Sequence, residues 1–186
     1  MSTLFRYILA FRYRVNGFLL TLYLRALGCA VAPGLRALRL PTFKEIPSGN
    51  IRIGRNVSMG RGIIFEITSS GSLIIGDGCT LGDFGRYSST HPIRMGKAVA
   101  IAEHVSIRGS FHNTSRADLI VNQDSHGADI EIGNDVLIGT HSVLLLGAKL
   151  PDGVVIGAHS LVVKGDNLTA YGIFAGSPLK HIRNRA

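Results

Sequence analysis

The clearest pattern in this chain is a repeat of six residues, which reads Ile132-Gly133-Asn134-Asp135-Val136-Leu137 and continues through Ile138-Gly139, Leu144-Leu145, Leu150-Pro151 and Ile156-Gly157 to Val162. A period of six fits neither the 3.6-residue repeat of an amphipathic helix nor the two-residue alternation of a half-buried strand. It is typical of a solenoid in which each hexapeptide forms one short strand and a turn, and three hexapeptides close one coil.

Shorter runs with the same period begin at Ile53, Ile75 and Ile101. We expect the aliphatic residue of each hexapeptide to point into the axis and to stack on its equivalents in neighbouring coils. The chain is rich in Gly, with 23 among 186 residues, and Gly suits turns that need a positive φ or a close approach of the backbone. We therefore predict an all-β solenoid, a parallel β-helix.

The pattern divides the chain into three parts. Residues 1–45 form a basic, apolar N-terminal helical segment, residues 46–170 the hexapeptide-repeat β-helix, and residues 171–186 a closing segment. The period stops at residues 111–129 and resumes at Ile130, so we expect a loop inserted between two coils. Such loops commonly form binding sites.

The N-terminal segment has an unusual charge balance. Residues 1–40 contain six Arg and no acid, and the whole chain has a net charge of +8. The stretch from Leu4 to Ala32 is apolar and free of Pro, which predicts a helix. It contains no charge-free run of the roughly 20 residues that span a bilayer. Two interpretations remain open: a helix lying on an anionic membrane surface, or a helix packed on the protein or on a neighbouring subunit.

The amino-acid composition argues against a nucleic-acid-binding protein and against a disulfide-stabilised one. The basic residues are not interleaved with aromatic ones and no nucleic-acid-binding signature occurs, so we expect no nucleic-acid partner. Two cysteines, Cys29 and Cys79, cannot form a disulfide scaffold, and we expect both to be reduced in an intracellular protein. We expect a cytoplasmic location, peripheral on the inner face of the plasma membrane, and a repeat core that begins near Ile51.

The end of the chain carries a second signature, Ala175-Gly176-Ser177-Pro178-Leu179-Lys180-His181-Ile182-Arg183. This run resembles the closing signature of the bacterial hexapeptide-repeat transferases, and the hexapeptides resemble the repeats of the same family. The resemblance covers roughly residues 50–186. The basic start makes the chain most similar to the capsule, colanic-acid and O-antigen O-acetyltransferases. The resemblance implies a left-handed parallel β-helix, a homotrimer, and acetyl-CoA as co-substrate with no metal ion.

The same resemblance points to a catalytic histidine in the inserted loop. In those enzymes a short Thr-Gly-Ser-like run precedes the catalytic His, and the segment from Ile107 to Asn113 matches that order, with Phe111 as the discordant residue. The match makes His112 the catalytic residue. The chemistry agrees, because a sugar hydroxyl needs a general base to attack a thioester, and a neutral His takes that proton at cellular pH.

Further candidates surround this histidine and follow it. The acceptor sugar would meet polar residues of the loop and one residue of an earlier break in the repeat: His91, Asn113, Asp118 and His126. The other histidines within hexapeptides, at positions 104, 141 and 159, are expected at structural or solvent-facing turns. By the resemblance, acetyl-CoA would lie in a groove between two subunits along Gly139, Thr140, Gly157 and Ala158, with its phosphates near Lys164, Lys180 and Arg183.

We therefore predict an acetyl-CoA-dependent O-acetyltransferase that acts on a sugar hydroxyl of a surface polysaccharide or its lipid-linked precursor. No Ser or Cys with an adjacent base suggests a covalent intermediate, so transfer would be direct in a ternary complex. Two alternatives stay open. A non-enzymatic β-helix scaffold or binding module would need no catalytic loop, and a zinc carbonic-anhydrase-like protein would need three gathered His ligands, whose characteristic close pair is missing. Which sugar and hydroxyl, and which acyl chain, are left undetermined.

Overall fold

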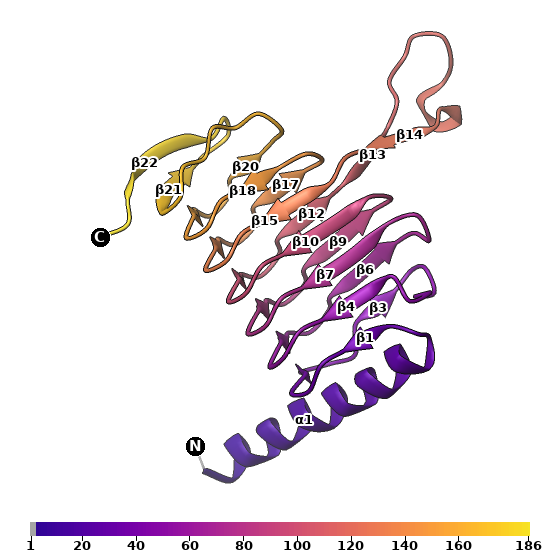
Figure 1. The fold of residues 1–186 in the computed structure, drawn as a ribbon, viewed down its shortest axis with the longest axis vertical. Coiled ribbons are helices and arrows are strands. Elements are labelled where there is room, and N and C mark those ends of the chain that lie inside the picture. The colour runs from indigo at the N-terminus through magenta and orange to yellow at the C-terminus, as the bar shows by residue number, and fades with distance from the viewer. Residues whose placement is uncertain (1–2) are drawn as a thin grey trace.

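The computed structural model describes residues 3–186, and in it a stack of β-coils is covered at one end by a single long helix (Figure 1). The helix α1 spans Thr3–Ala26. Each coil contributes one short strand to each of three parallel sheets, so strands that are neighbours in a sheet come from successive coils. This arrangement confirms the predicted β-solenoid.

The three sheets form the sides of the solenoid. The first contains β1 (Ala30–Val31), β4 (Ile51–Ile53), β7 (Ser72–Ile75), β10 (Pro92–Met95), β15 (Ile130–Ile132) and β18 (Lys149–Leu150). The second contains β2 (Arg36–Ala37), β5 (Ser58–Met59), β8 (Thr80–Leu81), β11 (Ala100–Ile101), β16 (Leu137–Ile138), β19 (Val155–Ile156), β21 (Gly172–Ala175) and the antiparallel β22 (Lys180–Asn184). The third contains β3 (Thr42–Phe43), β6 (Ile64–Ile67), β9 (Arg86–Ser89), β12 (Ser106–Arg108), β17 (Val143–Leu145) and β20 (Leu161–Val162).

The aliphatic position of the hexapeptide fills the axis of the solenoid, as its period predicts. Ile138 pairs in register with Ile156 of the next coil, and both side chains are fully buried. Burial of each such side chain contributes about 1.5–3 kcal/mol. The inward column of the third sheet is aromatic near α1, where the rings of Phe43, Phe65 and Tyr87 stack at centroid separations of 5.5 and 5.3 Å. The core is therefore continuous from the helix to the last coil.

The helix ends earlier than the sequence predicted. Gly28 adopts a φ of 78°, Cys29 N–H donates to the Leu24 carbonyl, and Gly28 N–H donates to that of Arg25. These two bonds form a Schellman motif, the common helix terminator built on a left-handed Gly. The predicted helix to Ala32 was therefore too long, because a Gly at this position stops a helix before any Pro is reached.

The boundary at residue 45 was also wrong, since residues 30–43 already form the first coil. Val31, Ala37 and Phe43 occupy its inward positions at a spacing of six. The period was present in the sequence, but a small residue and an aromatic one replaced the usual Ile or Leu. The solenoid core therefore begins near residue 30 and not near Ile51.

Helix α1 packs on this first coil. Leu20 and Leu24 are buried, and Asn16 donates a side-chain hydrogen bond to the Leu38 carbonyl at 2.8 Å. At Gly17 an added Cβ would overlap the carbonyl oxygen of Leu35, so the helix backbone lies directly against the coil. The helix thus belongs to the protein's own packing on one side, and removing residues 1–40 would expose an open coil end.

Candidate functional site

The inserted loop is a β-hairpin that leaves the solenoid at one corner (Figure 1). It lies between β12 of the third sheet and β15 of the first sheet, and we call this edge of the solenoid the hairpin corner. Strands β13 (Ser110–His112) and β14 (Ser125–Gly127) pair antiparallel, and a 3-10 turn, η1 (Ile120–Asn122), lies near the tip. The predicted loop between coils is therefore present, with an ordered base that positions its side chains.

The pairing of the hairpin gives it two distinct faces. His112 lies opposite Ser125, and Ser110 lies opposite Gly127, so the side chains of these four positions share one face. A Cβ added to Gly127 would overlap Nδ1 of His91, which places the His91 ring on that same face at the hairpin base. The structure therefore places two of the predicted site residues, His91 and His112, on one face of the hairpin, although they come from different coils.

The opposite face carries Phe111 and His126, which are paired across the two strands. The Arg108 guanidinium lies 5.4 Å from the centre of the Phe111 ring, a cation–π distance, and Nε of Arg108 is buried without a hydrogen-bond partner among the described residues. Phe111, which departed from the expected motif, thus fixes the hairpin to β12. His126 is separated from His112 by this geometry.

The imidazole of His112 is exposed, and its orientation is set by one backbone group. Nδ1 lies 3.2 Å from the carbonyl oxygen of Gln123. A carbonyl oxygen only accepts hydrogen bonds, so Nδ1 carries a proton in this contact, and in the neutral ring the lone pair is then on Nε2. The hairpin therefore favours, for the neutral ring of His112, the tautomer that a general base needs.

Gln123 is a residue that the sequence did not single out. Its side-chain amide accepts a hydrogen bond from the Ser115 N–H and donates to the carbonyls of Ser115 and Asp118, each at 2.8 Å. These three bonds hold Gln123 against the tip of the hairpin, and the carbonyl oxygen of Gln123 is the group that contacts His112. Nothing in a lone Gln within a polar loop marks such a role, because it depends on backbone groups that only the fold brings near.

The remaining loop candidates differ in availability. Asp118 is engaged within the loop, where its Oδ1 accepts hydrogen bonds from Leu119 N–H at 2.6 Å and from Asn122 at 3.2 Å. Asn113 is exposed next to His112, and its backbone N–H donates to the Asp124 carbonyl. Asn113 can therefore meet an acceptor with its side chain, whereas the carboxylate of Asp118 shapes the loop.

The predicted donor residues lie at another edge of the solenoid. Gly139, Thr140, Gly157 and Ala158 follow β16 and β19, at the corner between the second and third sheets. A Cβ on Gly139 would meet the backbone nitrogen of Ala158 at 2.5 Å, so this Gly is required by close stacking of the coils. The Thr140 hydroxyl donates to the Glu103 carbonyl at 3.0 Å.

The same edge carries a column of stacked rings, and we call it the histidine corner. Phe84, His104, His141 and His159 are exposed and stand on successive turns with centroid separations of 5.0, 4.7 and 4.9 Å. All four adopt a left-handed φ of 55–58°, which is uncommon for residues other than Gly. These histidines occupy solvent-facing turns. In the part of the chain that the structure describes, no three His, Cys, Asp or Glu side chains are placed to hold a metal ion.

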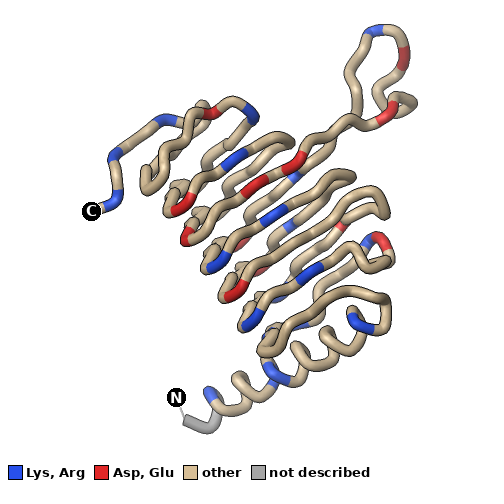
Figure 2. The backbone as a smooth tube through the Cα atoms, viewed as in Figure 1, with Lys and Arg blue, Asp and Glu red and all other residues tan. Residues whose placement is uncertain are grey.

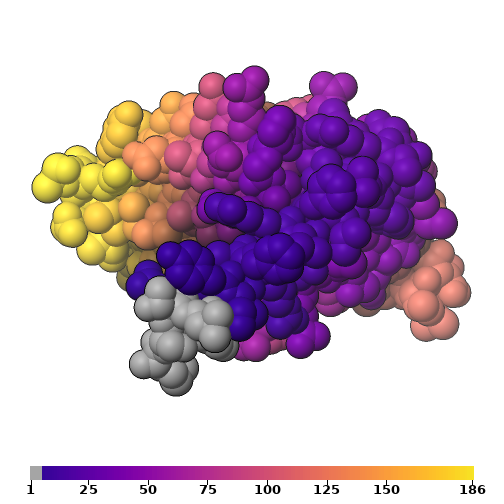
Figure 3. Space-filling model, turned by 90° about the horizontal axis from the view of Figure 1, so that it is seen from below, coloured from indigo at the N-terminus to yellow at the C-terminus, as the bar shows by residue number. Residues whose placement is uncertain are grey.

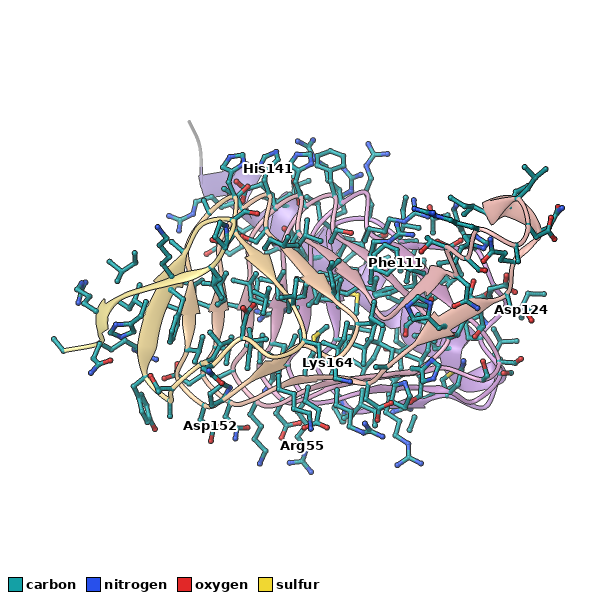
Figure 4. The ribbon with its side chains drawn as sticks, turned by 90° about the horizontal axis from the view of Figure 1, so that it is seen from above. Arg55, Phe111, Asp124, His141, Asp152 and Lys164 are labelled. Atoms are coloured by element: carbon teal, nitrogen blue, oxygen red, sulfur yellow. The ribbon has the colours of Figure 1, made fainter. Side chains whose placement is uncertain are left out.

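The predicted phosphate contacts lie on two other elements. Lys164 follows β20 at the hairpin corner, and its side chain packs over Gly147 of the preceding coil. Lys180 and Arg183 are exposed on β22, the strand that closes the second sheet. Figure 4 shows His141 at one edge of the solenoid, Arg55 and Asp152 along the opposite edge, and Phe111 on the hairpin arm. One chain therefore does not bring His112 and the Gly139–Thr140 turn into one site.

No family model matches the chain, but individual known proteins are similar to it. WbbJ of Escherichia coli (strain K12), which is named for O-acetyl transfer in lipopolysaccharide biosynthesis, is 27% identical over 183 residues, 94% of this chain and 92% of that protein. The chloramphenicol acetyltransferase of Morganella morganii is 47% identical over 57 residues, which are 31% of this chain. The match spans about a quarter (26%) of that enzyme's length.

Solved structures agree with the fold. AntD, an N-acyltransferase from Bacillus cereus in complex with dTDP and 3-hydroxybutyryl-CoA, superimposes with a TM-score of 0.75 at 20% identity, over 89% of this chain and 88% of that chain. The polysialic acid O-acetyltransferase OatWY gives a TM-score of 0.53 at 25% identity, over 78% of this chain and 75% of its own. The fold is that of the left-handed parallel β-helix acyltransferases. More narrowly, the likeness to proteins named O-acetyltransferase agrees with the hexapeptide-repeat acetyltransferase resemblance that the repeats and closing run indicated.

Proposed function

We propose that the protein transfers an acetyl group from acetyl-CoA to a sugar hydroxyl of a surface polysaccharide or of its lipid-linked precursor. One observation carries the proposal: His112 stands on an ordered hairpin with Nδ1 held by the Gln123 carbonyl and Nε2 left to act as a base. A non-enzymatic scaffold gives no reason for this tautomer. The likeness to WbbJ over almost the whole chain supports a surface-saccharide acceptor.

The reaction would proceed in one ternary complex. Nε2 of His112 takes the proton of the acceptor hydroxyl as the hydroxyl oxygen attacks the thioester carbonyl carbon. The carbon–sulfur bond of the tetrahedral intermediate then breaks, and the CoA thiolate receives the proton from Nε2. His91, on the same hairpin face, would orient the acceptor. Such a base contributes about 10²–10⁴ in rate.

We further propose that the site is completed by a second copy in a homotrimer. The hairpin corner and the histidine corner are different edges of one solenoid, so His112 of one chain needs the Gly139 and Gly157 turns of its neighbour. In a ring with threefold symmetry each chain offers one edge to the next, and three equivalent contacts close the assembly. The pantetheine arm would lie along those turns, with the phosphates near Lys164, Lys180 and Arg183.

The test is transfer of radiolabelled acetyl from acetyl-CoA to a panel of acceptors: lipid-linked saccharides, free oligosaccharides and chloramphenicol. We expect saccharide products that carry an ester, and loss of transfer in His112→Ala. Chloramphenicol belongs in the panel because of the strong local similarity to its acetyltransferases. Transfer to chloramphenicol alone would contradict the proposed acceptor class. Absence of any acetyl transfer or acetyl-CoA hydrolysis would support the scaffold alternative.

A further inference from the structure

Helix α1 has a large apolar surface that the described residues leave uncovered. While Gly17, Leu20 and Leu24 face the first coil, the opposite side exposes aromatic and aliphatic side chains to solvent. Tyr7, Phe11 and Phe18 are 70%, 69% and 61% exposed. We call this surface the outer face of α1; it consists of Tyr7, Ile8, Phe11, Val15, Phe18, Leu19 and Leu22.

The surroundings of the outer face are strongly basic. Residues 1–44 contain six Arg and one Lys and no acid; the first acidic residue of the chain is Glu45. Figure 2 shows basic positions along α1 and acidic ones only higher in the solenoid. A long exposed apolar face flanked only by positive charge is the pattern of a helix that lies in a membrane interface.

A groove beside the outer face combines both properties. It has a volume of about 660 Å³ and lies between α1 and the first coil, where Arg14, Arg25 and Arg36 line it together with Phe18 and Leu22. Guanidinium groups bind phosphate well because their paired N–H donors match its oxygens. The apolar side chains beside them suit the start of a hydrocarbon chain, so the groove fits a phospholipid headgroup.

The position of α1 leaves this surface open to a flat partner. The helix crosses the end of the solenoid, and the coils rise from its other side (Figures 1 and 3). Nothing in the described chain lies beyond the helix at that end. Of the helices described, none is long and apolar enough to cross a bilayer.

We infer that α1 docks the protein on an anionic phospholipid surface, with its outer face in the headgroup region and lipid phosphates at Arg14 and Arg36. A second copy of the chain fits less well. A symmetric contact through this face would bring the same Arg residues of both copies together, and like charges across an interface are unfavourable. An anionic lipid surface offers hydrocarbon to the apolar side chains and negative charge to the Arg residues. This inference is independent of the proposed acyl transfer.

The test is flotation of the full-length protein with vesicles of phosphatidylglycerol and phosphatidylcholine, beside vesicles of phosphatidylcholine alone. We expect binding to the anionic vesicles that weakens as salt rises. Arg14→Gln with Arg36→Gln should lower partitioning about 30-fold, which corresponds to about 1 kcal/mol per Arg. Arg52→Gln with Arg55→Gln, both exposed on the solenoid wall, is the matched control and should bind as the wild type does.

A second variant tests the apolar part. Phe11→Ser with Leu19→Ser and Leu22→Ser changes exposed side chains only, so the thermal unfolding midpoint should stay within a few degrees while flotation is lost. Wild-type protein that stays out of anionic vesicles at low salt would overturn the inference. So would a smaller oligomer in the Ser variant on sizing with light scattering, because that result would assign the outer face to contacts between copies.

Discussion

Nδ1 of His112, at the end of β13, lies 3.2 Å from the carbonyl oxygen of Gln123, on the returning arm of the same hairpin. This contact places a proton on Nδ1, so Nε2 is the basic atom of the neutral ring. It also makes the reactivity of His112 depend on how firmly the hairpin tip is held. The proposed activity therefore rests on a loop whose order comes from its own hydrogen bonds.

His112→Ala should abolish the base without disturbing the solenoid, because the side chain is exposed and contributes nothing to the core. We expect the acetyl-transfer rate to fall by about 10²–10⁴. Sizing and circular dichroism should match the wild type. A rate within tenfold of the wild type would show that His112 is not the base.

His91 and His126 should behave differently, although both lie at the hairpin. His91→Ala removes a ring on the His112 face, and we expect the KM for the acceptor to rise about tenfold, the equivalent of about one hydrogen bond. His126→Ala changes the opposite face and should alter both kinetic constants less than threefold. Steady-state kinetics on the two variants decides between them, and a larger effect at His126 would reverse the assignment of faces.

Gln123→Ala should act through His112 as a loss of positioning. Without the side-chain amide, the bonds to Ser115 and Asp118 are gone and the Gln123 carbonyl is less firmly placed. We expect kcat to fall about tenfold with an unchanged KM for acetyl-CoA. Nitrogen NMR of the His112 ring should show a smaller population protonated at Nδ1. An unchanged tautomer population would contradict the positioning role.

Lys180→Ala with Arg183→Ala should weaken binding of acetyl-CoA and leave binding of the acceptor unchanged. Both side chains are exposed on β22, and Coulomb attraction would act on the phosphate end of acetyl-CoA only. We expect a raised KM for acetyl-CoA, with a salt dependence that fades in the variant. A truncated thioester without the nucleotide phosphates is the control donor, and equal losses for both donors would assign these residues to structure.

The ion pair between Glu66 and Arg86 on neighbouring third-sheet strands predicts a pH dependence of stability. Partial burial alone would raise the pKa of Glu66, but the hydrogen bond and charge of Arg86, with the charge of Lys44, outweigh it and lower the pKa below 4.5. A depressed folded-state pKa adds stability that is complete at neutral pH and is lost as the pH falls through that pKa.

Urea unfolding between pH 7 and pH 3 measures this contribution. Glu66→Gln should be less stable than the wild type at pH 7, and the difference should shrink in the acid range. A difference that stays constant with pH would mean that Glu66 acts through packing and not through its charge.

The sequence by itself determined the solenoid, because a six-residue period can be read locally. Each aliphatic residue of the repeat can be buried only at the axis. Ile138 and Ile156 reach the axis for that reason, and the insertion that ends the period was visible for the same reason. The first coil shows the limit of this signal. Val31, Ala37 and Phe43 keep the spacing, but their mixed sizes hid it.

Only the tertiary structure decided which side chains meet. His91 and His112 come from different coils and share a hairpin face because β13 and β14 pair in one particular register. The same register separates His126 from them. The sequence of α1 is only weakly amphipathic, so it did not determine which side of the helix is buried. The close contact between Gly17 and Leu35 identifies that side. Pairing register and close backbone packing are non-local, so no sequence pattern within a single element could reveal them.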